Sequence, residues 1–86
     1  MAYKGVILYS TNHCPYCEQA KEFLSQNNVN YTEYRIDLND EDREILRQKT
    51  GRTATPTIAF PNGQVVVGFN PVQLEELLDL ENPRNI

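Results

Sequence analysis

The feature that most constrains this chain is a pair of cysteines, Cys14 and Cys17, separated by a proline and a tyrosine. They follow an apolar run at residues 6–9 and precede a segment whose apolar residues recur at helical spacing. The first sulfur therefore falls where a strand gives way to a helix. Unpaired backbone N–H groups and the helix dipole stabilise an anion at such a place. Because the thiolate is the reactive form of cysteine, this junction is a candidate redox site.

The first half of the chain predicts a strand, a helix and a second strand. Residues 4–10 are apolar on both faces at their centre, which is typical of a strand inside a sheet. Residues 15–26 predict a helix with Pro15 in its first position and an apolar stripe of Cys17, Ala20, Phe23 and Leu24. Residues 29–38 contain an edge strand with one solvated face and a more apolar face of Thr32, Tyr34, Ile36 and Leu38.

A second helix is predicted over residues 41–50. Asn39 or Asp40 can cap its N-terminus with a side-chain oxygen, and Gly51 stands where a left-handed helix end is expected. The apolar content of this helix is slight. It should therefore dock on the sheet through one narrow stripe, mainly Ile45 and Leu46.

The rest of the chain predicts a hairpin and a last helix. Residues 57–60 and 64–67 predict strands joined by an Asn-Gly turn, and Pro71 opens a helix whose apolar face holds Leu74, Leu77 and Leu78. The order β-α-β-α-β-β-α predicts an α/β fold. A four-stranded mixed sheet, with a parallel pair from the first β-α-β unit and an antiparallel pair from the hairpin, is covered by three helices. At 86 residues, we expect a single domain, 1–86.

Charge and hydropathy exclude several classes of partner. The net charge is −4 with a pI near 4.8, and no basic patch is evident, which argues against a nucleic-acid partner. The N-terminal apolar run of about four residues is shorter than a secretory signal or a membrane span. We therefore expect a cytoplasmic protein without a membrane partner. In a reducing compartment, two cysteines favour a catalytic or metal-binding role over a structural disulfide.

The spacing of the two cysteines assigns their expected roles. Cys14, at the exposed helix terminus, should be the attacking sulfur. Cys17 lies within the first turn and on the apolar stripe, so it should be largely buried and close enough to resolve a mixed disulfide. This division predicts thiol–disulfide exchange, with Cys14 and Cys17 as a redox-active disulfide. The alternative to a redox role is that the two cysteines are buried and lie near each other by chance.

Metal binding is the other serious alternative. A structural zinc site needs about four ligands, and the chain offers only Cys14, Cys17 and one histidine, His13, which is awkwardly adjacent to Cys14. We therefore predict no metal site within one chain. A cluster bridged between two chains, with a thiol cofactor completing the ligands, stays open. His13 is interpreted as a solvated loop residue.

A second candidate functional motif is the dipeptide Thr55-Pro56. Proline is tolerated at the entrance to a strand, which is the simple interpretation. A cis bond beside the cysteines would instead turn the backbone N–H and C=O of Thr55 outward. An extended disulfide substrate could then pair with them like an added strand.

Three motifs together resemble those of a glutaredoxin: residues 14–17 (CPYC), residues 51–56 (GRTATP) and residues 67–70 (VGFN). The resemblance covers residues 5–80, nearly the whole chain. It implies a thioredoxin fold with sheet order 2-1-3-4, a cis Pro56, and glutathione as reductant and co-substrate, with no tightly bound cofactor. Thioredoxins are less similar, because they usually carry Trp-Cys-Gly-Pro-Cys and this chain has no tryptophan.

Two departures from the glutaredoxin pattern concern the reductant. The lysine that usually precedes the first cysteine is absent from residues 10–13, and the usual Gly-Gly before the last helix is Val67-Gly68, with Asn70 near the expected acidic position. The segment from Gly68 to Pro71 is closer to glutaredoxin-like redoxins. These serve ribonucleotide reductase and accept electrons from thioredoxin reductase. Thioredoxin reductase is therefore the alternative electron source.

The resemblance also implies where glutathione would bind. Its cysteinyl backbone should pair with Thr55, beside Pro56. Its glutamyl carboxylate should meet the N–H groups around Phe69 and Asn70, after the turn at Gly68. Arg52 is the candidate for the other carboxylate, and Tyr16 should flank the sulfur site as an exposed ring.

The sequence as a whole therefore predicts a thiol–disulfide oxidoreductase of the glutaredoxin type that takes part in electron transport. Its expected substrates are disulfide-containing proteins and glutathione mixed disulfides, and it is expected to act as a monomer.

Overall fold

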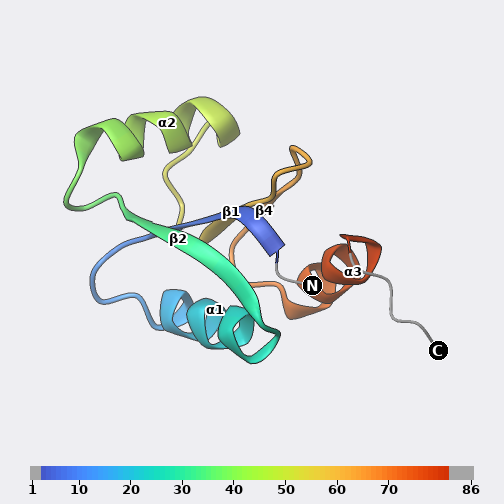
Figure 1. Ribbon diagram of the computed structural model, residues 1–86. Helices are drawn as coiled ribbons and strands as arrows, with labels where there is room; N and C mark the ends of the chain where they lie inside the picture. The colour runs from blue at the N-terminus through green and yellow to red at the C-terminus, as the bar shows by residue number, and fades with distance from the viewer. Residues whose placement is uncertain (1–2, 82–86) are drawn as a thin grey trace.

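A computed structural model describes the backbone of residues 3–81 and the side chains of residues 5–77. It contains seven elements in the predicted order (Figure 1). The bounds are β1 (Tyr3–Ser10), α1 (Pro15–Gln26), β2 (Val29–Arg35), α2 (Asp40–Thr50), β3 (Thr57–Ala59), β4 (Val65–Val67) and α3 (Pro71–Glu81).

The sheet has the order β2-β1-β3-β4, as predicted, so the strand that leads into the cysteines lies inside it. β1 pairs with β2 in parallel and with β3 antiparallel, and β3 pairs with β4 antiparallel. Leu8 of β1 lies between Glu33 on one side and Ile58 on the other. Because β1 is paired with a strand on each edge, the sheet fixes the position of its C-terminal end. The loop that leads from there to Cys14 is therefore anchored at its start.

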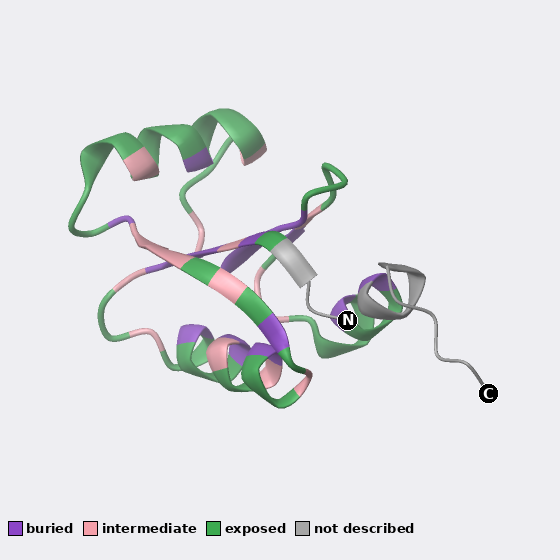
Figure 2. Ribbon diagram, in the orientation of Figure 1, coloured by how far each residue is buried: buried purple, intermediate pink, exposed green. Residues whose placement is uncertain are grey.

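Two apolar clusters hold the helices on the sheet, one on each face. The larger joins β1, β3 and β4 to α1 and α3, and contains Val6, Leu8, Ala20, Leu24, Val29, Ile58, Phe60, Val66, Leu74 and Leu77. The smaller joins the other face to α2, and contains Tyr9, Ile36, Leu46 and Ala59. Figures 1 and 2 show α1 and α3 on one side of the sheet and α2 on the other, with buried positions facing inward. The predicted apolar stripe of α1 is confirmed. In α3, Leu74 and Leu77 are buried as predicted, and Leu78 lies outside the described side chains.

One face of β2 is more solvated than the other, but it is not the predicted one. Asn30 and Thr32 are exposed on the side expected to be the more apolar, whereas on the other side Val29 is buried and Glu33 is half-buried. Tyr31 packs against the larger cluster on one face, whereas Tyr34 and Ile36 pack with the smaller cluster on the other. The strand ends at Arg35, so Leu38 is not part of it and its side chain is 74% exposed. β2 is an edge strand in its pairing. The cluster that includes α1 covers the face of Tyr31, while the opposite face is exposed at Asn30 and Thr32.

The docking stripe of α2 is narrower than predicted. Leu46 is fully buried, but Ile45 is 43% exposed, because successive residues of a helix point about 100° apart and only one can face the sheet. Among the two candidate caps, Asn39 is the one used, and its side chain accepts a hydrogen bond from Asp42 N–H at 3.1 Å. Gly51 ends the helix with φ 81°, as predicted.

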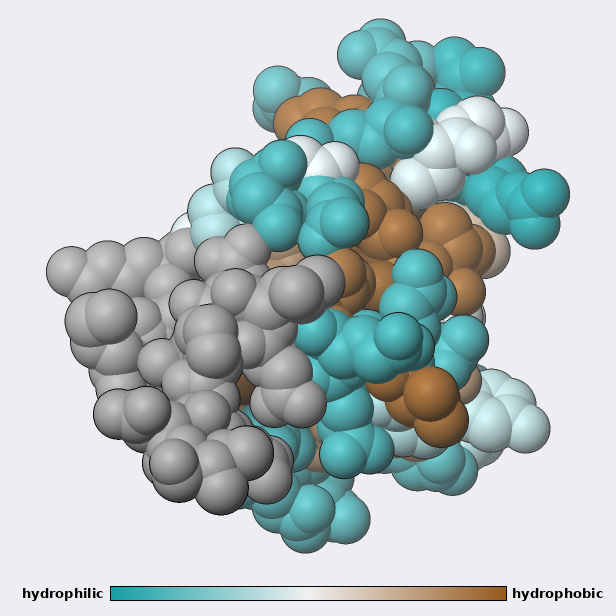
Figure 3. Space-filling model, turned by 90° about the vertical axis from the view of Figure 1, so that its right-hand side faces the viewer, coloured by the Kyte–Doolittle hydropathy of each residue, from teal (hydrophilic) through white to brown (hydrophobic). Residues whose placement is uncertain are grey.

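The described part of the side that carries α3 and the β3–β4 hairpin exposes both apolar and hydrophilic side chains (Figure 3). Figure 3 shows apolar patches there, interrupted by hydrophilic side chains. Within the described residues, no helix is both long enough and apolar enough to cross a membrane.

Candidate active site

Cys14 is the N-cap residue of α1. Its backbone is extended (φ −121°, ψ 97°), and its Sγ accepts a hydrogen bond from the N–H of Cys17 at 3.1 Å. A serine or threonine oxygen usually satisfies this third N–H of a helix. Pro15 occupies the first position and has no N–H to satisfy. The sulfur therefore replaces the usual capping oxygen, and a negative charge on it would lie at the positive end of the helix dipole.

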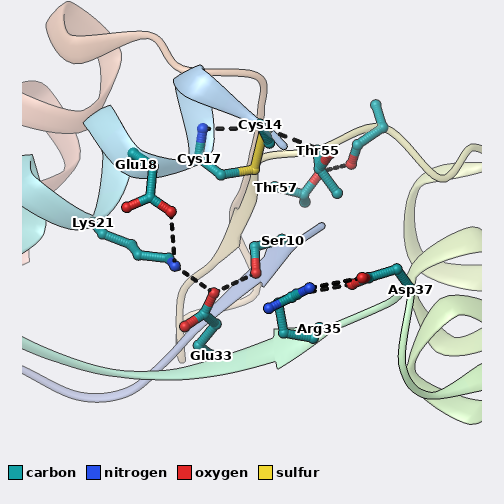
Figure 4. Close-up of a disulfide and its surroundings, with 11 residues drawn as sticks. Ser10, Cys14, Cys17, Glu18, Lys21, Glu33, Arg35, Asp37, Thr55 and Thr57 are labelled. Carbon is teal, nitrogen blue, oxygen red and sulfur yellow. Dashed lines mark hydrogen bonds and ion pairs between the residues drawn. A yellow bond between two sulfur atoms is a disulfide. The ribbon is translucent and has the colours of Figure 1, made fainter. Parts of the chain in front are cut away.

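The two sulfurs form a disulfide between Cys14 and Cys17, with Cα atoms 5.2 Å apart (Figure 4). Cys17 is 0% exposed and belongs to the apolar stripe of α1, as predicted. Cys14 is only partly buried. Of the two sulfur-bearing residues, Cys14 is thus the one that a substrate can reach from solvent.

The second motif lies beside the first. The Thr55-Pro56 bond is cis, and Thr55 Oγ1 is 3.9 Å from Cys14 Sγ. Pro56 is buried, and its C=O accepts a hydrogen bond of 2.7 Å from the N–H of Gly68. This bond joins the third motif to the second. Three segments that are far apart in the sequence therefore converge on Cys14.

The backbone of Thr55 is free to bind a ligand. In the part of the chain that the structure describes, neither its N–H nor its C=O has a hydrogen-bond partner. Nearby, Thr57 Oγ1 donates to the C=O of Ala54 at 2.8 Å, which fixes the loop from within. A polar backbone group next to a reactive sulfur, without an internal partner, can pair with an extended peptide.

The remaining predicted site residues lie around these segments. Tyr16 follows Cys14 by two residues and is 61% exposed. Phe69 packs edge-on against Phe23 of α1, with ring centroids 6.0 Å apart. Asn70 is exposed, and its Oδ1 accepts a hydrogen bond from Gln73 N–H at 3.1 Å, so it caps α3.

Arg52 is exposed, and its backbone is held by Thr50, whose Oγ1 both donates to the Arg52 C=O and accepts from its N–H. Its guanidinium group forms no ion pair with any described residue, whereas Arg35, Arg43 and Arg47 each have an acidic partner. Arg52 is therefore available to an anionic ligand.

Metal ligation has little support from the residues near the sulfurs. Among the side chains of residues 5–77, no group of three or more His, Cys, Asp or Glu is placed to hold a metal ion. His13 is exposed and has a positive φ of 53°.

Sequence reasoning missed a charged network below the first turns of α1 (Figure 4). Glu33 of β2 accepts hydrogen bonds from Ser10 of β1 at 2.5 Å and from Lys21 of α1 at 2.8 Å, both on Oε2. Lys21 also pairs with Glu18 at 3.2 Å. One feature of the sequence could have indicated a cation near the sulfurs: Lys21 lies four residues after Cys17, on the same side of the helix.

The pKa values of this pair are shifted in opposite directions. Burial opposes ionisation of Glu33, but hydrogen bonds from Lys21 and Ser10 outweigh it and lower the pKa of Glu33 below its ordinary value. The hydrogen bond to Glu33 raises the pKa of Lys21. Both groups are therefore charged at neutral pH.

Comparison with known proteins identifies the family of this arrangement. The sequence model of the glutaredoxin family matches residues 6–66. The chain is 42% identical to glutaredoxin 3 of Escherichia coli over 64 residues, which cover 74% of this chain and 76% of the relative. It is 29% identical over 72 residues to an uncharacterised glutaredoxin-like 8.6 kDa protein of Clostridium pasteurianum, covering 84% and 95%.

Solved structures give the same fold. The crystal structure of the thioredoxin-like protein BC3987 superposes with a TM-score of 0.80 and 34% sequence identity, covering 85% of this chain and 99% of that one. The predicted thioredoxin fold and its strand order are confirmed.

Proposed function

Because the chain belongs to the glutaredoxin family, and is therefore a thiol–disulfide oxidoreductase, we propose that Cys14 is its attacking sulfur and Cys17 its resolving sulfur. The observation that carries this assignment is the difference in exposure: Cys14 is partly buried and Cys17 is 0% exposed. Only a reachable sulfur can attack a protein disulfide. A buried neighbour can still attack the intermediate from within the protein.

The reaction proceeds in two exchanges. The Cys14 thiolate attacks one sulfur of the substrate disulfide, whose S–S bond breaks, and the other substrate sulfur leaves as a thiolate. Cys17 then loses its proton and attacks the Cys14 sulfur of the mixed disulfide. The second substrate sulfur then leaves as a thiolate. The substrate has gained two electrons, and the protein has lost two in forming the Cys14–Cys17 disulfide.

Glutathione is the proposed electron donor. One glutathione thiolate opens the Cys14–Cys17 disulfide by forming a mixed disulfide on Cys14, and a second displaces it as glutathione disulfide. The unpaired backbone groups of Thr55 would hold the cysteinyl part of glutathione, beside the buried Pro56. Arg52 would pair with a carboxylate, since it has no acidic partner among the described residues.

The other glutathione carboxylate would lie at the N-terminus of α3, near Gly68, Phe69 and Asn70. Helix N-termini favour anions. Asn70, however, already accepts a bond from Gln73 and carries no charge of its own. This end of the site therefore offers backbone N–H groups and little else to glutathione.

Thioredoxin reductase is a second candidate donor. Asn70 stands where glutaredoxins carry an acidic residue, and apolar Val67 and Val72 are exposed on either side of it. Exposed apolar side chains suit contact with a protein surface more than with a charged tripeptide. Ribonucleotide reductase would then be among the disulfide substrates, in the cytoplasm.

A donor experiment tests the assignment. The oxidised chain is supplied with either glutathione plus glutathione reductase or thioredoxin reductase plus NADPH, and reduction of the Cys14–Cys17 disulfide is followed in each. We expect reduction by glutathione. Reduction by thioredoxin reductase alone would replace glutathione as donor. A Cys14→Ser variant that kept full reductase activity would refute the role of Cys14 itself.

A further inference from the structure

Four charged side chains form a row on the α1 side of the sheet. Glu33 and Arg35 are two residues apart on β2 and therefore share a face, and they pair in register with Leu8 and Ser10 of β1. Lys21 lies over Glu33, and Asp37 accepts two hydrogen bonds from Arg35 at 2.8 and 2.7 Å. Positive and negative charges thus alternate along this row, which starts beside α1 with Lys21 and Glu33 and ends with Arg35 and Asp37 on the side toward α2 (Figure 4).

The Lys21 end of this row lies near the sulfurs. Lys21 follows Cys17 by four residues, about 6 Å along the helix axis, and long side chains of a helix lean back toward its N-terminus. Lys21 reaches both Glu33 and Glu18, the residue directly after Cys17. Ser10, 0% exposed, stands four residues before Cys14 and donates to Glu33 from below.

Lys21 and Glu33 affect a nearby thiolate in opposite directions, because the cation stabilises its negative charge and the carboxylate destabilises it. The side chains of Lys21 and Glu33 are only 26% and 28% exposed, so solvent screens their charges less than those of surface residues. The other charged or titratable groups around the site come from several segments. They are His13, Tyr16, Cys17 and Glu18 around the start of α1, Arg35 and Asp37 at and after the end of β2, and Arg52 in the loop before Pro56. Of these, Arg35 and Asp37 largely cancel each other because they are paired.

We propose that Lys21 and Glu33 set the charge environment of the Cys14 thiolate: Lys21 favours the thiolate, Glu33 opposes it, and Ser10 holds the Glu33 carboxylate in place. This proposal rests on Cys14 being the attacking sulfur. Lys21 and Glu33 touch neither sulfur, so they act as positioning and electrostatic residues and not as catalytic ones. The chain lacks the lysine that usually precedes the first cysteine of a glutaredoxin, and Lys21 supplies a cation from the following helix.

The test uses the reduced full-length chain and measures the pKa of Cys14 from the pH dependence of its alkylation by iodoacetamide. Lys21→Gln should raise this pKa, and Glu33→Gln should lower it. By Coulomb's law, a unit charge about 10 Å from a thiolate alters its acid dissociation constant about threefold when the effective dielectric constant lies between those of bulk water and a protein surface, and each change should produce a shift of this order. The double variant should return close to the starting value, and Lys21→Arg should preserve it.

Controls separate charge from structure. Glu44→Gln and Arg47→Gln break a comparable pair on the surface of α2 and should leave the pKa of Cys14 unchanged. Ser10→Ala removes a hydrogen bond without removing a charge, so it should shift the pKa of Cys14 less than either charge variant. Circular dichroism verifies folding, and if Lys21→Gln does not fold, the opposite shift of Glu33→Gln is tested alone.

Two outcomes would overturn the proposal. One is a shift of the same sign in Lys21→Gln and Glu33→Gln, which would indicate loosening of the helix. The other is no shift beyond that of the α2 controls. Either result would leave the assignment of Cys14 intact, because mass spectrometry of the alkylated wild-type chain shows independently which of the two sulfurs reacts.

Discussion

At the scale of single residues, chemistry at Cys14 depends on where its sulfur sits. The sulfur caps α1, lies 3.9 Å from the hydroxyl of Thr55, and is partly buried, whereas that of Cys17 is fully buried. The capping position and the burial of Cys17 follow from two cysteines at a strand–helix junction, so sequence could predict them. The closeness of Thr55 was implied only by the resemblance to glutaredoxins. The charge around the sulfur could not be predicted, because Glu33 comes from a strand that only the fold brings beneath the helix.

A residue-scale prediction concerns Arg52. If its unpaired guanidinium binds a carboxylate of glutathione, Arg52→Gln should raise the KM for glutathione about two- to fivefold, as expected for one exposed ion pair, and leave kcat unchanged. Lys49→Gln is the matched control, since Lys49 is an exposed cation nearby on α2 with no described ion pair. An equal rise in both variants would mean that only net charge matters.

At the scale of elements, the helices differ in how firmly they are held. α1 has three fully buried residues, whereas α2 has one, Leu46. The periodicity of α1 is strong, so its packing was predictable. In α2, two adjacent apolar residues could not be distinguished by sequence, and Ile45 was wrongly included. The solvated face of β2 was misassigned for a related reason: its alternation is weak, because each side of the strand mixes aromatic and polar residues.

An element-scale prediction follows from this difference. Leu46→Ala should lower the free energy of unfolding by about 2–5 kcal/mol, because it removes the only buried side chain through which α2 docks. Ile45→Ala, the neighbouring change on an exposed side chain, should cost less than about 1 kcal/mol. Urea denaturation followed by circular dichroism measures both. Similar losses in the two variants would contradict the observed orientation of α2.

At the scale of the whole molecule, the fold brings residues 14, 55 and 68 together from three segments, and both the β-α-β start and the hairpin were predictable from their patterns. The choice of electron donor is not contained in the fold. Under the proposed function it depends on a few side chains around Cys14: the unpaired cation of Arg52 would favour glutathione, and uncharged Asn70 would not.

Stability of the molecule should fall in acid, partly through Glu33. Hydrogen bonds keep the pKa of Glu33 below its ordinary value of 4.5, so the unfolded chain binds this proton more readily than the folded one. The stabilisation is therefore present above about pH 4.5 and is lost as the pH falls through the lower, folded value. Urea midpoints measured from about pH 7 down to about pH 3 should fall less steeply in Glu33→Gln than in the wild type. An unchanged slope would show that Glu33 is not stabilised by folding.

The division of labour between the two sulfurs is tested most directly by Cys17→Ser. The reduced variant is given a glutathionylated peptide with excess glutathione in one assay, and a protein disulfide with no other thiol present in another, and mass spectrometry follows the adduct on Cys14. We predict that deglutathionylation continues, because it needs only Cys14, while the protein disulfide assay stalls as a mixed disulfide that Cys17 would have resolved. Equal loss of both activities would contradict this division of roles.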